Sequence, residues 1–236
     1  MTTPAGQLEG RLWGAFLGRA SRFSIWAWVD GREELAHLPN PGRLPQILTP
    51  GRQLLLRAAA GAGRKTRFTA VGACLAGTLV SLDSTLPNRF FPHALGRGLI
   101  PRLAGWQIER REPRLGRGRA DFLLRRGGER MLVEVKSVTW VENGVALFPD
   151  APTARGRRHM RELAHAARRG EPAAVVFVIQ RPDAVAFSPG PVDHRFALAF
   201  RQALAAGMQA CALSCAFDGV QLELVRALDD TAIRLQ

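Results

Sequence analysis

The chain has 236 residues and a formal net charge of +13 at pH 7, with 33 Lys and Arg against 20 Asp and Glu. A hydrophobic fraction of 47% with 22% charged residues is typical of globular proteins and excludes a disordered chain. The longest apolar run, residues 173–179, is far shorter than the roughly 20 residues that cross a bilayer. The N-terminus lacks the pattern of a secretory signal, and three cysteines without metal-ligand spacing exclude a disulfide framework. We therefore expect a cytoplasmic protein with no membrane partner.

The excess of basic residues predicts a polyanionic partner. It is spread along the chain, with 10 basic and 5 acidic residues in 1–85 and 23 and 15 in 86–236. A positive field of this kind attracts nucleic acid through its phosphates. Arginine supplies all but two of the basic residues, so part of its abundance is compositional. The two lysines, Lys65 and Lys136, mark positions where an ammonium is of more use than a guanidinium.

Residues 1–84 predict an OB-like β-barrel that binds nucleic acid. Short strands with Gly and Pro turns between them, and no long helix, favour this architecture. Asn40 and Arg43 lie in a Pro-Asn-Pro-Gly-Arg turn and are candidate DNA contacts. Trp26 and Trp28 share one strand face and could stack bases, as could Phe68, but we expect at least one tryptophan in the core. The expected strands cover residues 12–18, 23–29, 33–38, 53–57, 66–73 and 78–82.

Residues 85–236 predict a second domain, a mixed α/β sheet with helices on its faces. A connector helix is expected at 85–98. His159 and His165 fall on a predicted helix without an evident partner, so packed or surface positions are expected for them. Cys211 and Cys215 fall on an apolar strand and are expected to be small core residues. The remaining elements are strands at 105–111, 118–124, 131–139 and 145–148, a helix at 153–169, a strand at 173–180, a helix at 193–206 and strands at 209–217 and 220–225.

Gly127-Gly128 lies between two strand-like runs and predicts a two-residue hairpin turn. Paired positions then have residue numbers that add up to 255, which places Asp121 opposite Glu134. Like charges directly opposite each other are destabilising, so this pairing makes sense if a divalent cation lies between them. Lys136 follows Glu134 by two residues and therefore projects from the same strand face.

This arrangement suits hydrolysis of a phosphodiester bond. Asp121 and Glu134 would bind Mg²⁺ or Mn²⁺, because such ions take one or two carboxylates and keep several waters. Lys136 would orient the attacking water or neutralise charge in the transition state. Glu109, on the preceding strand, is a candidate third acid. The alternative interpretation is that Glu-Val-Lys is one solvated face of an ordinary amphipathic strand.

Several short segments follow one another in a distinctive order between about residues 8 and 225. They are Pro39-Asn40-Pro41-Gly42-Arg43-Leu44, Arg119-x-Asp121-Phe122, Glu134-Val135-Lys136-Ser137-Val138, Phe148-Pro149-Asp150-Ala151 and Arg155-Gly156-x-x-His159-x-x-Glu162-Leu163. Together they resemble one family, the sugar fermentation stimulation protein A (SfsA) family. The resemblance implies an OB-like barrel followed by a domain similar to the PD-(D/E)xK nucleases. It also implies DNA binding, with a proposed regulatory role in sugar (maltose) metabolism. Asp121, Glu134 and Lys136 match the nuclease-like triad, and Glu109 matches an upstream acid.

Arginines near the candidate site predict phosphate contacts with little sequence preference, since arginine forks fit phosphate oxygens. They are Arg117, Arg119, Arg155, Arg157 and Arg158. Three functions follow from the sequence: a Mg²⁺-dependent DNA endonuclease, a non-catalytic DNA-binding regulator that keeps the nuclease fold, and a protein that binds RNA or single strands mainly through its barrel. A homodimer is left open.

Overall fold

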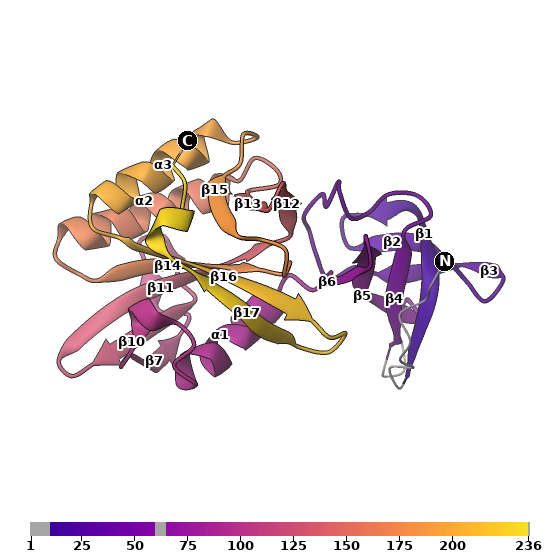
Figure 1. Ribbon diagram of the computed structural model, residues 1–236, viewed down its shortest axis with the longest axis horizontal. Helices are drawn as coiled ribbons and strands as arrows, with labels where there is room; N and C mark the ends of the chain where they lie inside the picture. Colours follow the sequence, from indigo (N-terminus) through magenta and orange to yellow (C-terminus); the bar gives the residue numbers. More distant parts are fainter. Residues whose placement is uncertain (1–9, 60–64, 236) are drawn as a thin grey trace. The chain divides into compact units, whose positions relative to one another are not determined.

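A computed structural model describes residues 10–59 and 65–235, which form two compact units (Figure 1). The first unit contains the described residues up to Leu86 together with Ala216–Gln221. The second contains Pro87–Cys215 and the described residues from Leu222 onward. The sequence placed the boundary after residue 84 and assigned all later residues to the second domain. Residues 216–221, which are the last two residues of β16 and the turn that follows it, belong to the first unit, and a local pattern could not show this.

The first unit is a closed barrel of short strands. Its sheet order is β3-β2-β1-β4-β5-β6, and a parallel pairing of β3 with β5 closes it at Ala36↔Phe68 and His37↔Thr69. Full closure removes the exposed edges that an open sheet of this size would have. The strands are β1 (Arg11–Ser21), β2 (Ser24–Val29), β3 (Arg32–His37), β4 (Gln53–Ala58), β5 (Phe68–Leu75) and β6 (Thr78–Ser81).

Alternation along β2 decides which side chains fill the barrel. Ile25, Ala27 and Val29 point inward and are buried in the barrel core. Trp26 and Trp28 point outward and are 42% and 47% exposed. The expectation that at least one of these tryptophans belongs to the core is therefore wrong. The inward positions are already filled by smaller residues, so the strand register leaves both indoles on the surface.

Gly14 of β1 marks a place where two strands approach closely. A Cβ atom built at this residue would lie 2.8 Å from the backbone oxygen of Trp28 and 2.9 Å from Val29 Cγ2. Real Cβ atoms do not come this near to a backbone oxygen, so the barrel wall requires glycine at this point.

The second unit contains all three α-helices of the described residues and most of the strands. Its helix α1 lies where the sequence predicts a connector helix, but most of it belongs to the body of this unit. Phe91 of α1 packs on Phe122, with ring centroids 4.8 Å apart. The helices are α1 (Leu86–Gly96), α2 (Ala154–Arg168) and α3 (His194–Ala205), with short 3₁₀ turns η1 (Pro101–Leu103) and η2 (Asp230–Ala232). The strands are β7 (Gln107–Arg111), β8 (Arg114–Leu115), β9 (Gly118–Arg119), β10 (Phe122–Arg126), β11 (Glu129–Val138), β12 (Trp140–Glu142), β13 (Val145–Phe148), β14 (Ala173–Ile179), β15 (Ala186–Pro189), β16 (Gln209–Phe217) and β17 (Leu222–Leu228).

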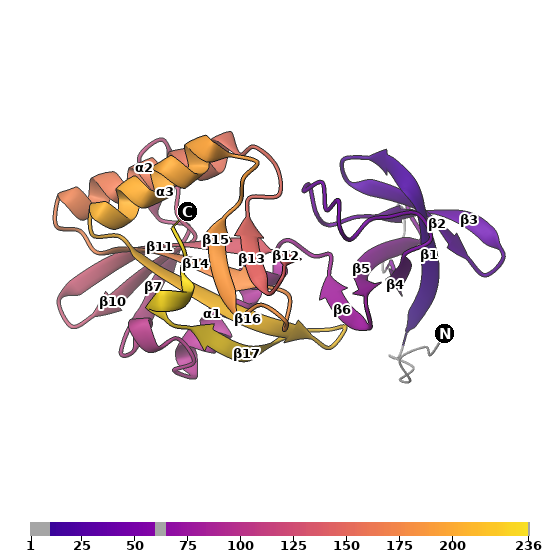
Figure 2. The same cartoon turned by 45° about the horizontal axis from the view of Figure 1, so that its top comes forward.

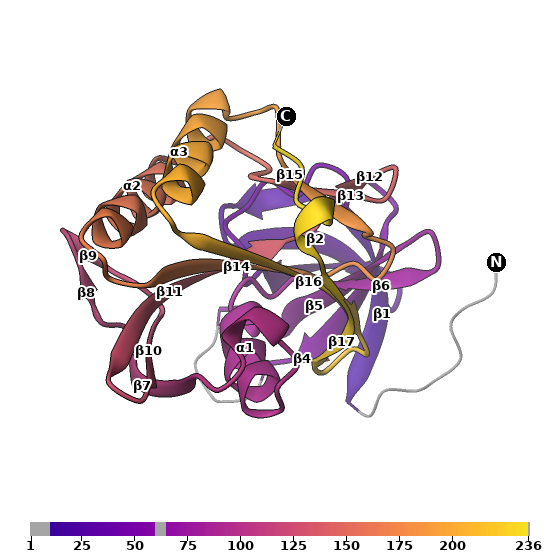
Figure 3. The ribbon, with the colours of Figure 1, turned by 60° about the vertical axis from the view of Figure 1, so that its left-hand side comes forward.

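A mixed six-stranded sheet organises this unit, with the order β17-β16-β14-β11-β10-β7. β11, β14 and β16 run parallel, whereas β10 pairs antiparallel with β11 and β7. Helices α2 and α3 lie side by side on one face, and α1 lies on the other (Figures 1 and 3). A smaller sheet, β12-β13-β15, lies beside the main one (Figure 2). The prediction of a mixed α/β sheet with helices on its faces is confirmed.

The core of the second unit lies between the sheet and the pair α2–α3. Every residue of β14 is buried, as expected for a central parallel strand covered on both faces. Phe177 of this strand stacks on Phe187 at 4.0 Å between ring centroids and meets Phe200 edge-on at 5.6 Å. Cys211 and Cys215 are buried, as predicted. Among the described residues, no helix combines the length and apolar character needed to cross a membrane.

Candidate active site on the β10–β11 hairpin

The Gly127-Gly128 turn folds β10 and β11 into the predicted hairpin. Phe122 pairs with Val133 and Arg126 with Glu129, so paired residue numbers add up to 255. Glu134 and Lys136 therefore project from one face of β11, while Val133 and Val135 are buried on the other. Lys136 Nζ donates a hydrogen bond to Glu134 Oε1 at 2.5 Å.

Asp121 lies at the point where β10 begins, and its side chain is fixed from two directions. Oδ2 accepts a hydrogen bond from the backbone N–H of Val135 at 2.7 Å, and Oδ1 accepts one from Asn88 Nδ2 of α1 at 2.8 Å. The side chain thus replaces a ladder bond that a continuous strand would make. For this reason the strand predicted over residues 118–124 is divided into β9 and β10, with Asp121 in the break.

Glu134 is buried and receives two donors on the same oxygen. Lys136 Nζ and His159 Nδ1, the latter from α2, both donate to Glu134 Oε1. The other oxygen, Oε2, is buried without a hydrogen-bond partner among the described residues, and so is His159 Nε2. His159 is 1% exposed, so it is a packed residue as expected, but its contact with a buried carboxylate was missed. In the sequence, the only signal for this contact is that His159 belongs to the Arg155-Gly156-x-x-His159 segment.

The two carboxyl groups titrate in opposite directions. Burial raises the pKa of Asp121, and the Glu134 charge raises it further, against the hydrogen bonds from Val135 and Asn88. Burial also opposes ionisation of Glu134, but the hydrogen bond from His159 and the charge of Lys136 outweigh it and lower the Glu134 pKa. Asp121 and Glu134 are thus close enough to repel; His159 and Lys136 together compensate the charge of Glu134, whereas Lys136 only partly compensates that of Asp121.

This oxygen donor set fits a hard divalent cation. Asp121 and Glu134 are close enough for the Glu134 charge to raise the pKa of Asp121, and Glu134 Oε2 is a buried acceptor without a hydrogen-bond partner among the described residues. Within residues 10–59 and 65–235, no three His, Cys, Asp or Glu side chains gather closely enough to hold a metal by themselves. Magnesium keeps several waters and takes one or two carboxylates, so a pair of acids satisfies it.

Glu109 does not join this group. Both of its oxygens are bound by Arg130, with Nε–Oε2 at 2.9 Å and the second guanidinium nitrogen at 2.8 Å from Oε1. Arg130 pairs with Arg125 near the hairpin turn, whereas Asp121 lies at the opposite end. The prediction of Glu109 as a third acid is not supported, because the β7–β10 register carries it away from Asp121.

A basic hollow of about 370 Å³ lies between α2 and the β8–β9 hairpin. Leu132 lines it, two residues before Glu134 and on the same strand face, so the hollow is near the paired acids. Arg158 of the predicted phosphate contacts lines it, at 3.8 Å from Glu162. The other polar residues of its lining are Arg114, Arg161, Glu162, His165, Arg169 and Glu171.

The other predicted phosphate contacts divide into exposed and bound arginines. Arg117 and Arg155 are exposed. Arg119 forms an ion pair with Glu112 at 2.8 Å, and this pair is weak because both side chains are exposed. Arg157 instead donates to Asp193 Oδ2 at 2.7 Å and is largely buried. Its guanidinium joins α2 to the start of α3, so the structure gives Arg157 a structural role and does not support it as a DNA contact.

The candidate contacts in the barrel also divide. Asn40 is 6% exposed, and its Oδ1 accepts a hydrogen bond from the N–H of Gly42 at 2.8 Å. Its side chain shapes the turn that the sequence indicated, so the prediction of Asn40 as a DNA contact is not supported. Arg43, two residues later, is exposed.

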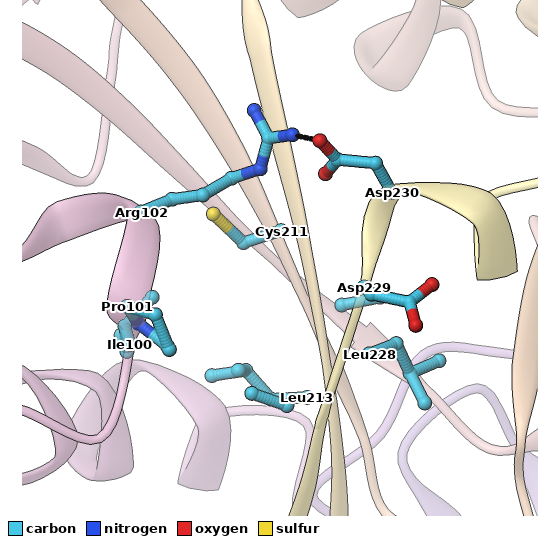
Figure 4. A pocket seen from close by; sticks show the side chains of 10 residues that line it. Ile100, Pro101, Arg102, Cys211, Leu213, Leu228, Asp229 and Asp230 are labelled. Carbon is cyan, nitrogen blue, oxygen red and sulfur yellow. Dashed lines mark ion pairs between the residues drawn. The ribbon is translucent and has the colours of Figure 1, made fainter.

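An apolar cavity of about 360 Å³ lies elsewhere in the second unit (Figure 4). Arg102 and Asp230 form an ion pair at its rim. Cys211 also lines it, but burial raises the pKa of this thiol to about 11, so it is protonated and unreactive at neutral pH. None of the candidate site residues lines this cavity, and we assign no chemistry to it.

The fold and the site together define the class: a two-domain protein with an OB barrel and a mixed α/β domain that presents paired carboxylates and a lysine on a hairpin. Family models agree. Residues 17–82 match the SfsA N-terminal OB domain, and residues 85–221 match the sugar fermentation stimulation protein RE domain.

Relatives and a solved structure support the same assignment. The chain is 46% identical to a sugar fermentation stimulation protein homolog of Moorella thermoacetica, over 89% of this chain and 92% of that protein. It is 39% identical to the homolog of Methanothermobacter thermautotrophicus, over 96% and 95% of the two chains. The solved structure of Pyrococcus furiosus SfsA in complex with Ca²⁺ superposes with a TM-score of 0.87 at 30% identity, covering 99% of this chain and 100% of that one. The chain belongs to the sugar fermentation stimulation protein (SfsA) family.

Proposed function

We propose that the protein is a DNA-binding phosphodiesterase of the PD-(D/E)xK type whose Asp121 and Glu134 hold Mg²⁺ or Mn²⁺. The observation that carries this proposal is the buried Oε2 of Glu134, which has no hydrogen-bond partner among the described residues and whose carboxylate lies near enough to Asp121 to raise its pKa. A buried carboxylate oxygen without a donor is costly unless something occupies it, and a cation is the partner that two acids accept. The Ca²⁺ in the described Pyrococcus furiosus structure is compatible with a cation site in this family.

Each residue then has a defined role. Asn88 and the Val135 N–H hold the Asp121 carboxylate, and His159 holds Glu134 so that Oε2 faces away from the helix contact. A bound divalent cation would polarise the phosphate and lower the pKa of a coordinated water. Lys136, on the same strand face, would orient the nucleophile or neutralise charge that develops on the phosphate.

The basic hollow supports DNA as the substrate. Its arginines outnumber its acids, and it is lined by Leu132, which shares a strand face with Glu134. Arg117, Arg119 and Arg155 are exposed nearby in sequence and would contact phosphates without reading bases. Arg43 would add a contact from the barrel. We expect little sequence preference. The logarithm of the binding constant should fall linearly with the logarithm of the salt concentration, with a slope of about −0.9 for each phosphate contact on duplex DNA.

A second function, a DNA-binding regulator of sugar metabolism that does not turn over, is favoured by one observation. Glu109 is held by Arg130 and does not complete an acidic triad. In that case the same arginines bind DNA, and the paired acids serve only a structural role.

Nicking of supercoiled plasmid separates the two functions. The full chain is incubated with Mg²⁺, with Mn²⁺ or with EDTA, beside Lys136→Ala and the matched control Lys65→Ala, which changes the other lysine. We expect cation-dependent nicking by the parent and by Lys65→Ala, and a loss of at least about 100-fold in Lys136→Ala, the usual scale for one positioned electrostatic group.

Plasmid binding is measured in parallel, so that loss of catalysis is separated from loss of affinity. Lys136→Ala should bind plasmid nearly as well as the parent, because the phosphate contacts lie on the arginines. No cation-dependent nicking, or equal nicking by Lys136→Ala, would refute the phosphodiesterase and leave the regulator.

A further inference from the structure

Three large aromatic side chains are exposed at one strand of the barrel. Phe23 precedes β2 and is 47% exposed, and Trp26 and Trp28 on β2 are 42% and 47% exposed. Aromatic side chains of this size contribute strongly to cores and interfaces when buried, so three of them left partly exposed at one strand are unfavourable in water. Scattered exposed hydrophobic residues need no explanation, but Trp26 and Trp28 share one strand face and Phe23 lies in the turn just before this strand, so together they mark a contact surface.

The neighbouring strand leaves these indoles uncovered. Trp26 pairs with Gly18 and Trp28 with Ala15 on β1, the two smallest residue types. A Cβ atom built at Gly18 would meet no heavy atom within 4 Å, so the surface beside Trp26 is open. On the other side, Leu35 and Glu33 of β3 are the partners. The two rings therefore stand at an open surface bordered by small residues.

The surroundings are more basic than acidic. Arg22 lies over the Phe23 ring at 5.3 Å from its centroid, and Arg19 donates hydrogen bonds to the backbone oxygens of Gly42 and Arg22. Both guanidinium groups therefore lie at the β1–β2 turn, beside Phe23. Glu33, opposite Trp28, is the one acid paired directly with a tryptophan of this face in the β2–β3 register. Exposed aromatic rings with arginines beside them favour a ligand that combines a planar ring with a negative charge.

The spacing of the tryptophans matches nucleobases. Residues two apart on a strand are separated by about 6.6–6.8 Å, which is twice the roughly 3.4 Å rise of stacked bases. One base therefore fits between the two indoles, or one base rests on each. Bases in a duplex are already stacked on each other, so only an unpaired strand offers free faces.

We propose that Trp26 and Trp28 on the outer face of β2, with Phe23 in the adjacent turn, bind single-stranded DNA by stacking unpaired bases on the indoles, while Arg19 and Arg22 at the same turn contact the phosphates. This proposal rests on the proposed DNA binding but not on the nuclease chemistry. A strand bound here would be held as a single strand, whereas the basic hollow of the second unit contacts phosphates of either form.

The test measures binding of fluorescein-labelled oligothymidylate, of a matched duplex and of oligouridylate to the full chain in EDTA, by fluorescence anisotropy. EDTA excludes turnover, so failure of the nuclease proposal does not affect the result. The variants are Trp26→Ala, Trp28→Ala, their conservative Trp→Phe forms and Glu33→Gln. Leu12→Ala is the matched control, since Leu12 is an exposed apolar residue of the same barrel that pairs with β4.

Each Trp→Ala change should weaken oligothymidylate binding at least about fivefold, as expected for loss of one base-stacking contact. The Trp→Phe forms should retain most of the affinity, and Leu12→Ala should bind like the parent. Glu33→Gln should bind more tightly, because it removes a negative charge beside Trp28. Duplex affinity should change less than twofold, and circular dichroism should show an unchanged fold.

Four outcomes overturn the proposal. They are unchanged oligothymidylate binding in the Trp26→Ala/Trp28→Ala double variant, an equal loss for duplex, tighter binding of oligouridylate than of oligothymidylate, and concentration-dependent self-association that the double variant abolishes. The last result, read by sedimentation velocity, would make this face an interface between two copies of the chain.

Discussion

Asp193 connects the two helices that cover the candidate site, and its removal should destabilise the second unit. Oδ1 accepts a hydrogen bond from the Phe196 N–H at 3.0 Å and caps α3. Oδ2 accepts from the Thr153 N–H at 2.8 Å and from Arg157 at 2.7 Å, at the start of α2. One carboxylate therefore fixes the beginnings of both helices, and α2 carries His159.

The cost of Asp193→Ala follows from these contacts. Loss of the N-cap costs about 1 kcal/mol. Leaving a largely buried guanidinium without its carboxylate costs about 1.5–3 kcal/mol more. We therefore expect a loss of roughly 3 kcal/mol in the free energy of unfolding, or a fall in Tm of roughly 6–12 °C for a unit of this size.

The pH dependence has a definite sign. Burial opposes ionisation of Asp193, but hydrogen bonds from Thr153 and Phe196 and the Arg157 charge outweigh it and lower the pKa. The contribution to stability is thus present above the unfolded pKa near 3.9 and is lost as the pH falls through the lower folded pKa. The difference in stability between the parent and Asp193→Asn should accordingly shrink below about pH 4.

Urea unfolding followed by circular dichroism measures these effects, with the matched pair Arg157→Ala and Arg155→Ala as a further check. Arg157→Ala should lower stability and leave DNA affinity unchanged. Arg155→Ala, which changes an exposed residue, should leave stability unchanged and lower DNA affinity. An Asp193→Ala variant within about 0.5 kcal/mol of the parent would refute the reasoning, since that is the range of neutral surface changes.

Three further predictions concern the site and the two cores. Burial and the Glu134 charge raise the pKa of Asp121 in the folded protein. The free energy of unfolding therefore decreases as the pH rises above the unfolded pKa of about 3.9, because the folded state resists ionisation of this group. Asp121→Asn should therefore raise the Tm in EDTA at pH 7, and a scan with Mg²⁺ or Mn²⁺ should show no further stabilisation, unlike the parent. Gly14→Ala should destabilise the barrel by about 1–3 kcal/mol in urea unfolding, because its Cβ would lie 2.8 Å from the Trp28 backbone oxygen. Phe177→Ala should cost about 3–5 kcal/mol by the same assay, since it removes a fully buried ring from a stacked cluster.

Local rules in the sequence determined much of the fold. The Gly127-Gly128 turn set the hairpin register, which runs from Arg126↔Glu129 to Phe122↔Val133 and leaves Asp121 one residue before the paired segment. Gly and Pro punctuation located the barrel strands, because turn chemistry depends on a few neighbouring residues. The all-apolar run at β14 indicated a buried strand, since only burial on both faces tolerates such a sequence.

Only the tertiary structure decided which polar groups meet. His159 reaches Glu134 because α2 packs across the sheet, and no spacing within one element encodes that crossing. Arg157 and Arg155 are two residues apart and look alike in sequence, yet one is bound to Asp193 and the other is exposed. Similarly, the positions opposite Trp26 and Trp28 on β1 are small, and this pairing leaves both indoles in water. The net charge of the chain predicted a polyanionic partner. Which arginines remain available to that partner depends on the ion pairs and hydrogen bonds that each arginine makes in the folded protein.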